Sequence, residues 1–201
     1  MERITNQNQK YSGLQLIIWH FNGNRLKHHL SIKISQIMNY KVLFLDIDGV
    51  LNSKLYYKYI YKPEDGGSRF DPYCVILVQK LVEEFSLKVV ISSTWRDGAM
   101  NRLKKELNEN NFMDYLHEDW LTPIVRPASR GKEIKLWIDN HPEVKDYLIL
   151  DDNENLLDHQ FRRFVKTSNY LGMVQECYHQ ARNLLLSYNQ IRVEPTVVME
   201  Y

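Results

Sequence analysis

Two aspartates that are one residue apart follow an apolar run in the stretch VLFLDIDGVLNS, residues 42–53. Residues i and i+2 of a strand point to the same side, so Asp46 and Asp48 can face one substrate together. One carboxylate can attack a phosphorus atom, and the other can protonate the leaving oxygen and later activate water. Gly49 then allows the backbone to turn sharply beside the pair. Ionised carboxylates beside apolar residues are costly unless they are paired or bound to metal, so the pair predicts a charged partner.

Polar residues also follow two further apolar runs. VVISST ends in hydroxyl residues that include Ser92 and Ser93, and LILDD ends in Asp151 and Asp152. Ligands of parallel sheets bind at the carboxyl ends of the strands, where these side chains would meet. Four carboxylates in one place require a cation, and Mg²⁺ prefers carboxylate oxygens together with water and phosphate. The sequence therefore predicts a Mg²⁺ site formed by both pairs of aspartates.

The elements that must position these residues alternate along the chain. Continuous apolar runs predict buried strands at 41–47, 87–94 and 145–155, and residues 161–168 fit a short fourth strand. Apolar residues at helical spacing predict helices at 73–86, 98–111, 129–142 and 172–186. Strands that alternate with helices predict an α/β fold with a mostly parallel sheet.

The length of 201 residues suggests one domain, at 38–190, with an N-terminal extension (1–37) and a C-terminal tail or edge strand (191–201). The first segment is either an upstream extension before Met38 or a hairpin or helix packed on the domain. The net charge of +1 gives no overall attraction to nucleic acid or membranes. No apolar run reaches the roughly 20 residues of a membrane span. The two cysteines suggest no disulfide framework, so we expect a cytoplasmic protein.

Four motifs, in order along the chain, resemble those of the haloacid dehalogenase-like (HAD) phosphohydrolases. DIDGVLN resembles motif I, VVISST motif II, SRGKEI motif III and LILDD motif IV. The resemblance covers about residues 40 to 187. It implies a Rossmann-like HAD fold and a Mg²⁺-dependent phosphomonoesterase that acts through an aspartyl-phosphate intermediate.

The resemblance also implies roles for the residues of the first two motifs. Asp46 would be the nucleophile and a metal ligand. Asp48 would be the general acid/base, and its backbone carbonyl would contact the metal. Ser92 would bind the phosphoryl group, with Ser93 as the alternative. From the residues alone, the aspartates could instead form local backbone hydrogen bonds in a turn, and the serines could cap a helix.

In motif III, the resemblance implies that either Arg130 or Lys132 supplies the cation that neutralises the nucleophile and the phosphate. In motif IV, it implies that Asp151 and Asp152 hold Mg²⁺. Each motif also has a structural interpretation. The KEIK pattern is typical of a solvated helix face, and Asp152 could cap a following helix.

A finer resemblance rests on DIDGVLN, ISSTWR, RGKEIKLWI and ILDD. Together these stretches are similar to HAD phosphatase domains of bacterial and phage nucleic-acid repair proteins. That similarity implies that the substrate is a nucleotide or a nucleic-acid terminal phosphate. The alternatives are a small-metabolite phosphatase, for example for sugars, and a non-catalytic module that keeps the HAD scaffold to bind phosphate.

Two segments bear on how the substrate is enclosed. Residues 54–72 contain four closely spaced tyrosines with interleaved lysines, which either stack bases or form a flap that shields the site. Residues 95–128 read as one helix plus a loop, so neither segment is long enough for a full cap domain. At the start of the second segment, Trp95 either contacts the substrate or packs in the core. Arg96 either contacts the substrate or pairs with a structural acid.

Overall fold

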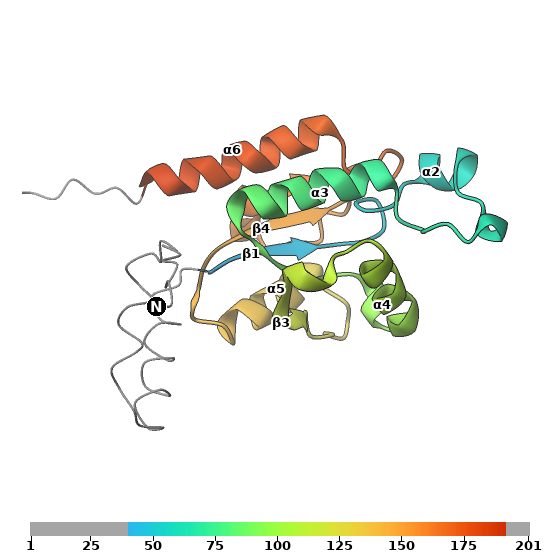
Figure 1. Cartoon of the computed structure of the whole chain (residues 1–201). Helices are drawn as coiled ribbons and strands as arrows, with labels where there is room; N and C mark the ends of the chain where they lie inside the picture. Colours follow the sequence, from blue (N-terminus) through green and yellow to red (C-terminus); the bar gives the residue numbers. More distant parts are fainter. Residues whose placement is uncertain (1–39, 192–201) are drawn as a thin grey trace, which may run out of the picture. The chain divides into compact units, whose positions relative to one another are not determined.

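The first apolar run forms strand β1 (Tyr40–Leu45), the central strand of a five-stranded sheet in the computed structural model (Figure 1). The order is β3-β2-β1-β4-β5, and every neighbouring pair is parallel. The other strands are β2 (Lys88–Ile91), β3 (Leu116–Leu121), β4 (Val144–Asp151) and β5 (Phe164–Lys166). This sheet confirms the predicted α/β, Rossmann-like fold.

The structure describes residues 40–191. The predictions for the N-terminal extension and for the C-terminal tail beyond residue 191 concern residues outside this range. In the described range, no helix is long and apolar enough to cross a membrane.

Helices cover both faces of the sheet. On one face, Leu43 and Leu45 pack in a buried cluster with residues of α3 (Pro72–Phe85) and α6 (Gln175–Ile191) (Figure 1). On the other face, Val42 and Phe44 pack with residues of α5 (Arg130–Asp139), including Trp137. Burying one such side chain stabilises the fold by about 1.5–3 kcal/mol. This two-sided burial explains why β1 is apolar at every position from Val42 to Leu45.

The register of the three central strands sets the position of the site. Leu45 at the end of β1 pairs with both Ile91 of β2 and Leu150 of β4. The backbone N–H of the next residue, Asp46, donates to the carbonyl of Leu150 at 3.0 Å, and the N–H of Ser92 donates to Leu45 at 2.8 Å. The polar ends of the three strands therefore meet at one edge of the sheet, as predicted.

Residues 116–121 form β3, although we predicted loop there. The stretch LHEDWL is polar and partly exposed, because β3 is an edge strand that pairs only with β2. Its sequence therefore lacks the continuous apolar pattern of the central strands. The fourth predicted strand is shorter than expected, since β5 is preceded by a 3₁₀ helix, η5 (Asp158–Arg163).

The tyrosine-rich segment begins with a short helix, α2 (Lys54–Tyr59), that the sequence did not predict. The Ser53 side chain caps it by accepting a hydrogen bond from the N–H of Tyr56. Tyr56 is buried, and its hydroxyl donates to the carbonyl of Ser68 at 2.9 Å. At least one of the four tyrosines is therefore a packing residue.

No separate cap domain exists among the described residues, which belong to a single compact unit. Between β1 and α3 lie only α2 and the 3₁₀ helix η2 (Pro63–Asp65). Between β2 and α5 lie η3 (Thr94–Arg96), α4 (Met100–Glu109), η4 (Met113–Tyr115) and β3. Both insertions are too short for a second domain, which confirms the expected minimal cap.

Candidate active site

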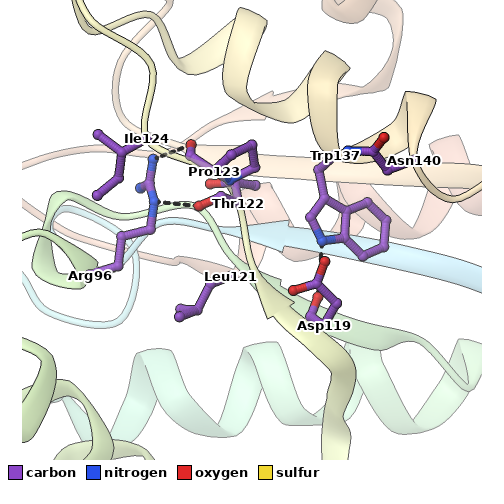
Figure 2. Close-up of a pocket in the computed structure, with 8 residues that line it drawn as sticks. All are labelled: Arg96, Asp119, Leu121, Thr122, Pro123, Ile124, Trp137 and Asn140. Carbon is purple, nitrogen blue, oxygen red and sulfur yellow. Dashed lines mark hydrogen bonds between the residues drawn. The ribbon is translucent and has the colours of Figure 1, made fainter.

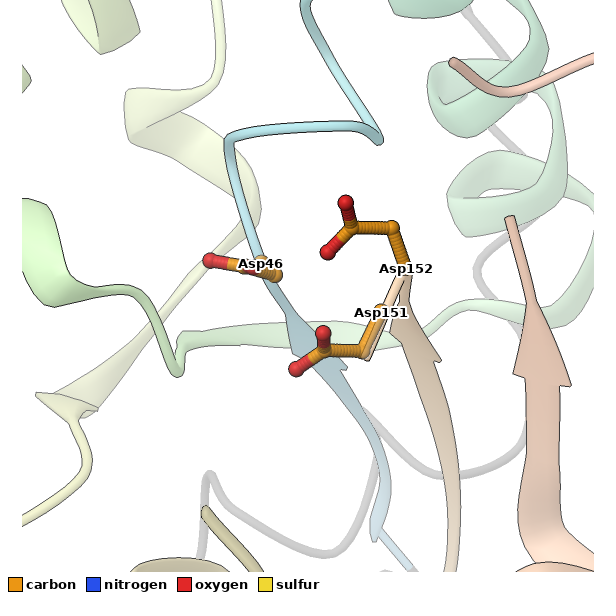
Figure 3. A group of neighbouring side chains, drawn as sticks. All are labelled: Asp46, Asp151 and Asp152. Carbon is orange, nitrogen blue, oxygen red and sulfur yellow. The ribbon is translucent and has the colours of Figure 1, made fainter. Parts of the chain in front are cut away.

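Three carboxylates gather at the carboxyl edge of the sheet. Figure 3 shows Asp46 at the end of β1, and Asp151 and Asp152 at the end of the neighbouring β4. Each offers one oxygen, and these oxygens all lie within 4.8 Å of one another. Asp46 and Asp151 are buried, whereas Asp152 is half-buried. We call these three residues the acidic cluster.

Arg130 at the start of α5 links the acidic cluster to β2. Its Nε lies 2.9 Å from Oδ2 of Asp151, and its Nη2 lies 3.5 Å from Oδ1 of Asp46. Its Nη1 donates to Oγ of Ser92 at 3.3 Å. One guanidinium group thus contacts side chains that follow three different strands.

The local sequence explains why Arg130 reaches this position. The N–H of Gly131 donates to the carbonyl of Asn155, which anchors the first turn of α5 beside the segment that follows β4. A Cβ at Gly131 would lie 2.5 Å from the backbone nitrogen of Leu157, so only glycine allows this approach. Lys132 is exposed and has no hydrogen bond or ion pair with another described residue. The geometry therefore favours Arg130 over Lys132 as the cation of the site.

Both predicted serines face the acidic cluster. Ser92 accepts from Arg130, and the nearby hydroxyl of Ser93 lowers the pKa of Asp46, against the larger effect of burial. Both side chains are buried. Ser93 also caps η3, since its Oγ accepts from the N–H of Trp95 at 3.4 Å. The structural interpretation, a helix cap, therefore applies to Ser93, and its role as a phosphate ligand stays a prediction.

Asp48 lies at the site but outside the acidic cluster. Its Oδ1 accepts from Nδ2 of Asn52, and its Oδ2 accepts from Nε1 of Trp95, both at 2.8 Å. Asp48 is exposed, whereas Asp46 is buried. The two aspartates of motif I therefore occupy different environments.

Gly49 makes the turn that follows them. Its φ of +74° is in the left-handed region, and a Cβ there would lie 2.6 Å from the carboxyl group of Asp152. Its carbonyl accepts from Oγ1 of Thr167 at 2.6 Å, which fixes the turn against the residue after β5. Only glycine fits this close approach to the acidic cluster.

Burial and repulsion shape the protonation of the acidic cluster. Burial, followed by the charge of Asp151, raises the pKa of Asp46, although the Arg130 guanidinium opposes this. Burial likewise raises the pKa of Asp151. Arg130 thus contacts two buried carboxylates, and a further positive charge would stabilise their ionised forms.

The donor set of the acidic cluster fits Mg²⁺. All of its side-chain donors are carboxylate oxygens, which are hard ligands of the kind that Mg²⁺ prefers. The side chain of Asp48 belongs to no such group, and its two oxygens accept hydrogen bonds from Asn52 and Trp95. Asp46, Asp151 and Asp152 are therefore the side chains that would hold the ion.

A second polar group lies beside the site and contains Arg96, which is buried. Figure 2 shows Arg96 donating to the carbonyls of Thr122 and Pro123, in the wall of a pocket with a volume of about 390 Å³. Its Nη2 also lies 2.5 Å from Oε2 of Glu133, in a buried ion pair. Arg96 thus pairs with a structural acid, one of the two predicted readings, and holds the segment that carries Trp95.

The parallel sheet, with an acidic cluster and a cation at its carboxyl edge, places the protein in the HAD-like class. A family model described as the HAD domain in Swiss Army Knife RNA repair proteins matches residues 42–177. The chain therefore belongs to this family, which confirms the resemblance seen in its motifs. No curated protein and no solved structure shows significant similarity to it.

Two residues of the site escaped the sequence reasoning. The sequence predicts no role for Asn52, and it predicts that Trp95 either contacts the substrate or packs in the core. Both contact Asp48. The signal that could have found them is their place in the segments that follow β1 and β2. That position in the sequence does not predict that both side chains donate hydrogen bonds to Asp48.

Proposed function

We propose that this protein is a Mg²⁺-dependent phosphomonoesterase that acts through an aspartyl-phosphate, on a nucleotide or a nucleic-acid terminal phosphate. The observation that carries the proposal is the position of Arg130. Its guanidinium group contacts Asp46, Asp151 and Ser92 at the edge where ligands of parallel sheets bind. A phosphoryl group beside Asp46 would have the arginine and the serine hydroxyls as its partners.

In the proposed reaction, Asp46 is the nucleophile. Its carboxylate oxygen attacks phosphorus, the bond from phosphorus to the leaving oxygen breaks, and Asp48 donates a proton to that oxygen. Asp48 then removes a proton from water, which attacks phosphorus and releases inorganic phosphate. The Asp46 carboxylate is regenerated. Arg130, Ser92 and Ser93 orient the phosphoryl oxygens throughout.

The acidic cluster supports the metal dependence in this proposal. Bound Mg²⁺ would neutralise charge on the phosphoryl oxygens and lower the repulsion between Asp46 and its substrate. Asp151 and Asp152 would hold the ion, and the Asn169 side chain supports Asp152 through a hydrogen bond of 2.7 Å.

The proposed substrate rests on the family and on the open site. The family is described by its occurrence in RNA repair proteins. No separate cap domain encloses the site among the described residues, so the part of a long substrate beyond its terminal phosphate can remain outside the site. Both points favour a nucleic-acid end over a small sugar phosphate.

The reaction is tested by hydrolysis of an aryl phosphate with Mg²⁺, with EDTA, and with the Asp46→Asn variant. We expect turnover only in the wild type with Mg²⁺. If the wild type is as inactive as Asp46→Asn, the non-catalytic binding module becomes the better interpretation. If EDTA leaves turnover unchanged, the metal dependence is wrong.

The substrate class is tested with a panel of 3′- and 5′-phosphorylated oligonucleotides, mononucleotides and sugar phosphates. We expect the highest kcat/KM on an oligonucleotide. Higher kcat/KM on a sugar phosphate would favour the small-metabolite phosphatase.

A further inference from the structure

The Asp48 side chain is exposed, yet both of its carboxylate oxygens have fixed partners. The indole N–H of Trp95 donates to one oxygen, and the amide of Asn52 donates to the other, each at 2.8 Å. An exposed aspartate without such bonds would move freely between rotamers. The two donors come from separate segments, one from the motif I turn and one from the segment after β2.

Both donors are themselves held in place. Asn52 is 2% exposed, and its Oδ1 accepts from the N–H of Gly49 at 3.1 Å. The Trp95 ring packs against Phe70 with a centroid separation of 6.1 Å, and the Arg102 guanidinium lies 5.9 Å from its centre. The donors are therefore ordered independently of Asp48.

The position of Asp48 has a chemical consequence. The group of carboxylates within 4.8 Å of one another contains Asp46 but excludes Asp48, although only Ile47 separates them in sequence. A carboxylate drawn into the acidic cluster would bind the cation and could not exchange protons with a leaving group. The bonds to Trp95 and Asn52 oppose that movement.

We propose that Trp95 and Asn52 are positioning residues that hold Asp48 apart from the acidic cluster, so that it remains the proton donor and acceptor. We call these two donors the Asp48 clamp. The proposal rests on the proposed function, in which Asp48 is the general acid/base. The clamp acts through Asp48 and not through contact with the reacting phosphorus.

The first test examines the clamp without activity. The chain has four tryptophans, so ¹⁵N-labelled indoles give few signals, and Trp95→Phe identifies the Trp95 signal by its loss. In the Asp48→Ala variant, we expect the Trp95 indole signal to move and its hydrogen exchange to accelerate, while the other indole signals remain in place. A Trp95 signal that does not respond to Asp48→Ala overturns the clamp.

The second test uses leaving groups of different basicity. Trp95→Phe removes the N–H but retains an aromatic ring. General acid/base catalysis is worth about 10²–10⁴-fold, so a misplaced acid should lower kcat on an alkyl phosphate by about tenfold or more. An aryl phosphate with an acidic leaving group needs no proton to leave, so its transfer of the phosphoryl group to Asp46, measured as the first-turnover release of the phenol, should slow much less. KM should change little for either substrate.

Trp120→Phe is the matched control. Trp120 is also half-buried against the core, and its indole donates to no other described residue. We expect this variant to retain wild-type kcat on both substrates. Equal losses on both substrates in Trp95→Phe would indicate a general structural role and overturn the clamp. A wild type without turnover on any phosphate ester would overturn the proposed function instead, and the indole signals still decide whether the clamp exists.

Discussion

Replacing Glu133 with alanine should destabilise the protein strongly, although Glu133 lies outside the acidic cluster. Glu133 is 5% exposed, and its Oε2 lies 2.5 Å from Nη2 of Arg96, which is 8% exposed. Its other oxygen accepts from the N–H of Val125 at 3.2 Å. The Glu133→Ala variant would leave a buried guanidinium without an opposite charge and a backbone N–H without its acceptor.

The magnitude follows from that burial. Breaking a buried ion pair by removing one partner costs about 3–5 kcal/mol, because the remaining charge stays buried without compensation. Arg96 keeps carbonyl acceptors in Ser93, Thr122 and Pro123, which favours the lower end of that range. We therefore expect the free energy of unfolding to fall by about 3 kcal/mol.

Urea unfolding, followed by circular dichroism, measures this loss. With a typical slope of about 2 kcal/mol per molar urea, the midpoint should fall by about 1.5 M. The control is Asp139→Asn in the same helix, which removes an exposed ion pair between Asp139 and Lys135. Such a pair contributes about 0.5 kcal/mol or less. If Glu133→Ala shifts the midpoint no more than this control does, the reasoning about the buried pair is refuted.

Three further predictions concern the site and the fold. Arg130→Met should lower kcat on an aryl phosphate by about 10²–10³-fold, as expected for a lost donor to the reacting group, whereas Lys132→Met should leave it nearly unchanged. Gly49→Ala should abolish turnover and lower the unfolding midpoint, because its φ of +74° and the Asp152 carboxyl group 2.6 Å away exclude a Cβ. Burial lowers the pKa of His117 below its ordinary 6.5. As pH falls through 6.5, the His117 imidazole therefore takes up a proton in the unfolded chain before it does so in the folded protein, and the free energy of unfolding falls. His117→Gln should reduce that acid loss in urea unfolding between about pH 7 and pH 5.

The central strands could be predicted because burial on both faces determines their sequence pattern. Strands β1, β2 and β4 are buried by helices on both faces, so each contains a continuous apolar run. Strand β3 and helix α2 could not be predicted in this way. β3 is a polar edge strand, and α2 is a helix of six residues whose pattern is too short to show a period.

The part of the candidate site that lies at the ends of strands could be predicted from the sequence. Parallel strands in register bring Asp46, Ser92 and Asp151 together, and only the order of the strands had to be assumed. The choice between Arg130 and Lys132 could not be made from sequence, since both lie in the first turn of one helix. It depends on the direction of each side chain, which the packing of Gly131 against Leu157 determines.

The two aspartates of motif I show how a local rule can fail at a site. A spacing of two places side chains on the same side only while the chain remains a strand, and β1 ends at Leu45. Beyond Leu45 the backbone turns, since the N–H groups of Val50 and Leu51 donate to the carbonyl of Ile47, and the side chain of Asn52 donates to Asp48. Asp46 consequently joins the acidic cluster, while Asp48 lies beside Trp95. This divergence is what allows neighbouring identical residues to take the different roles of nucleophile and proton carrier that we propose.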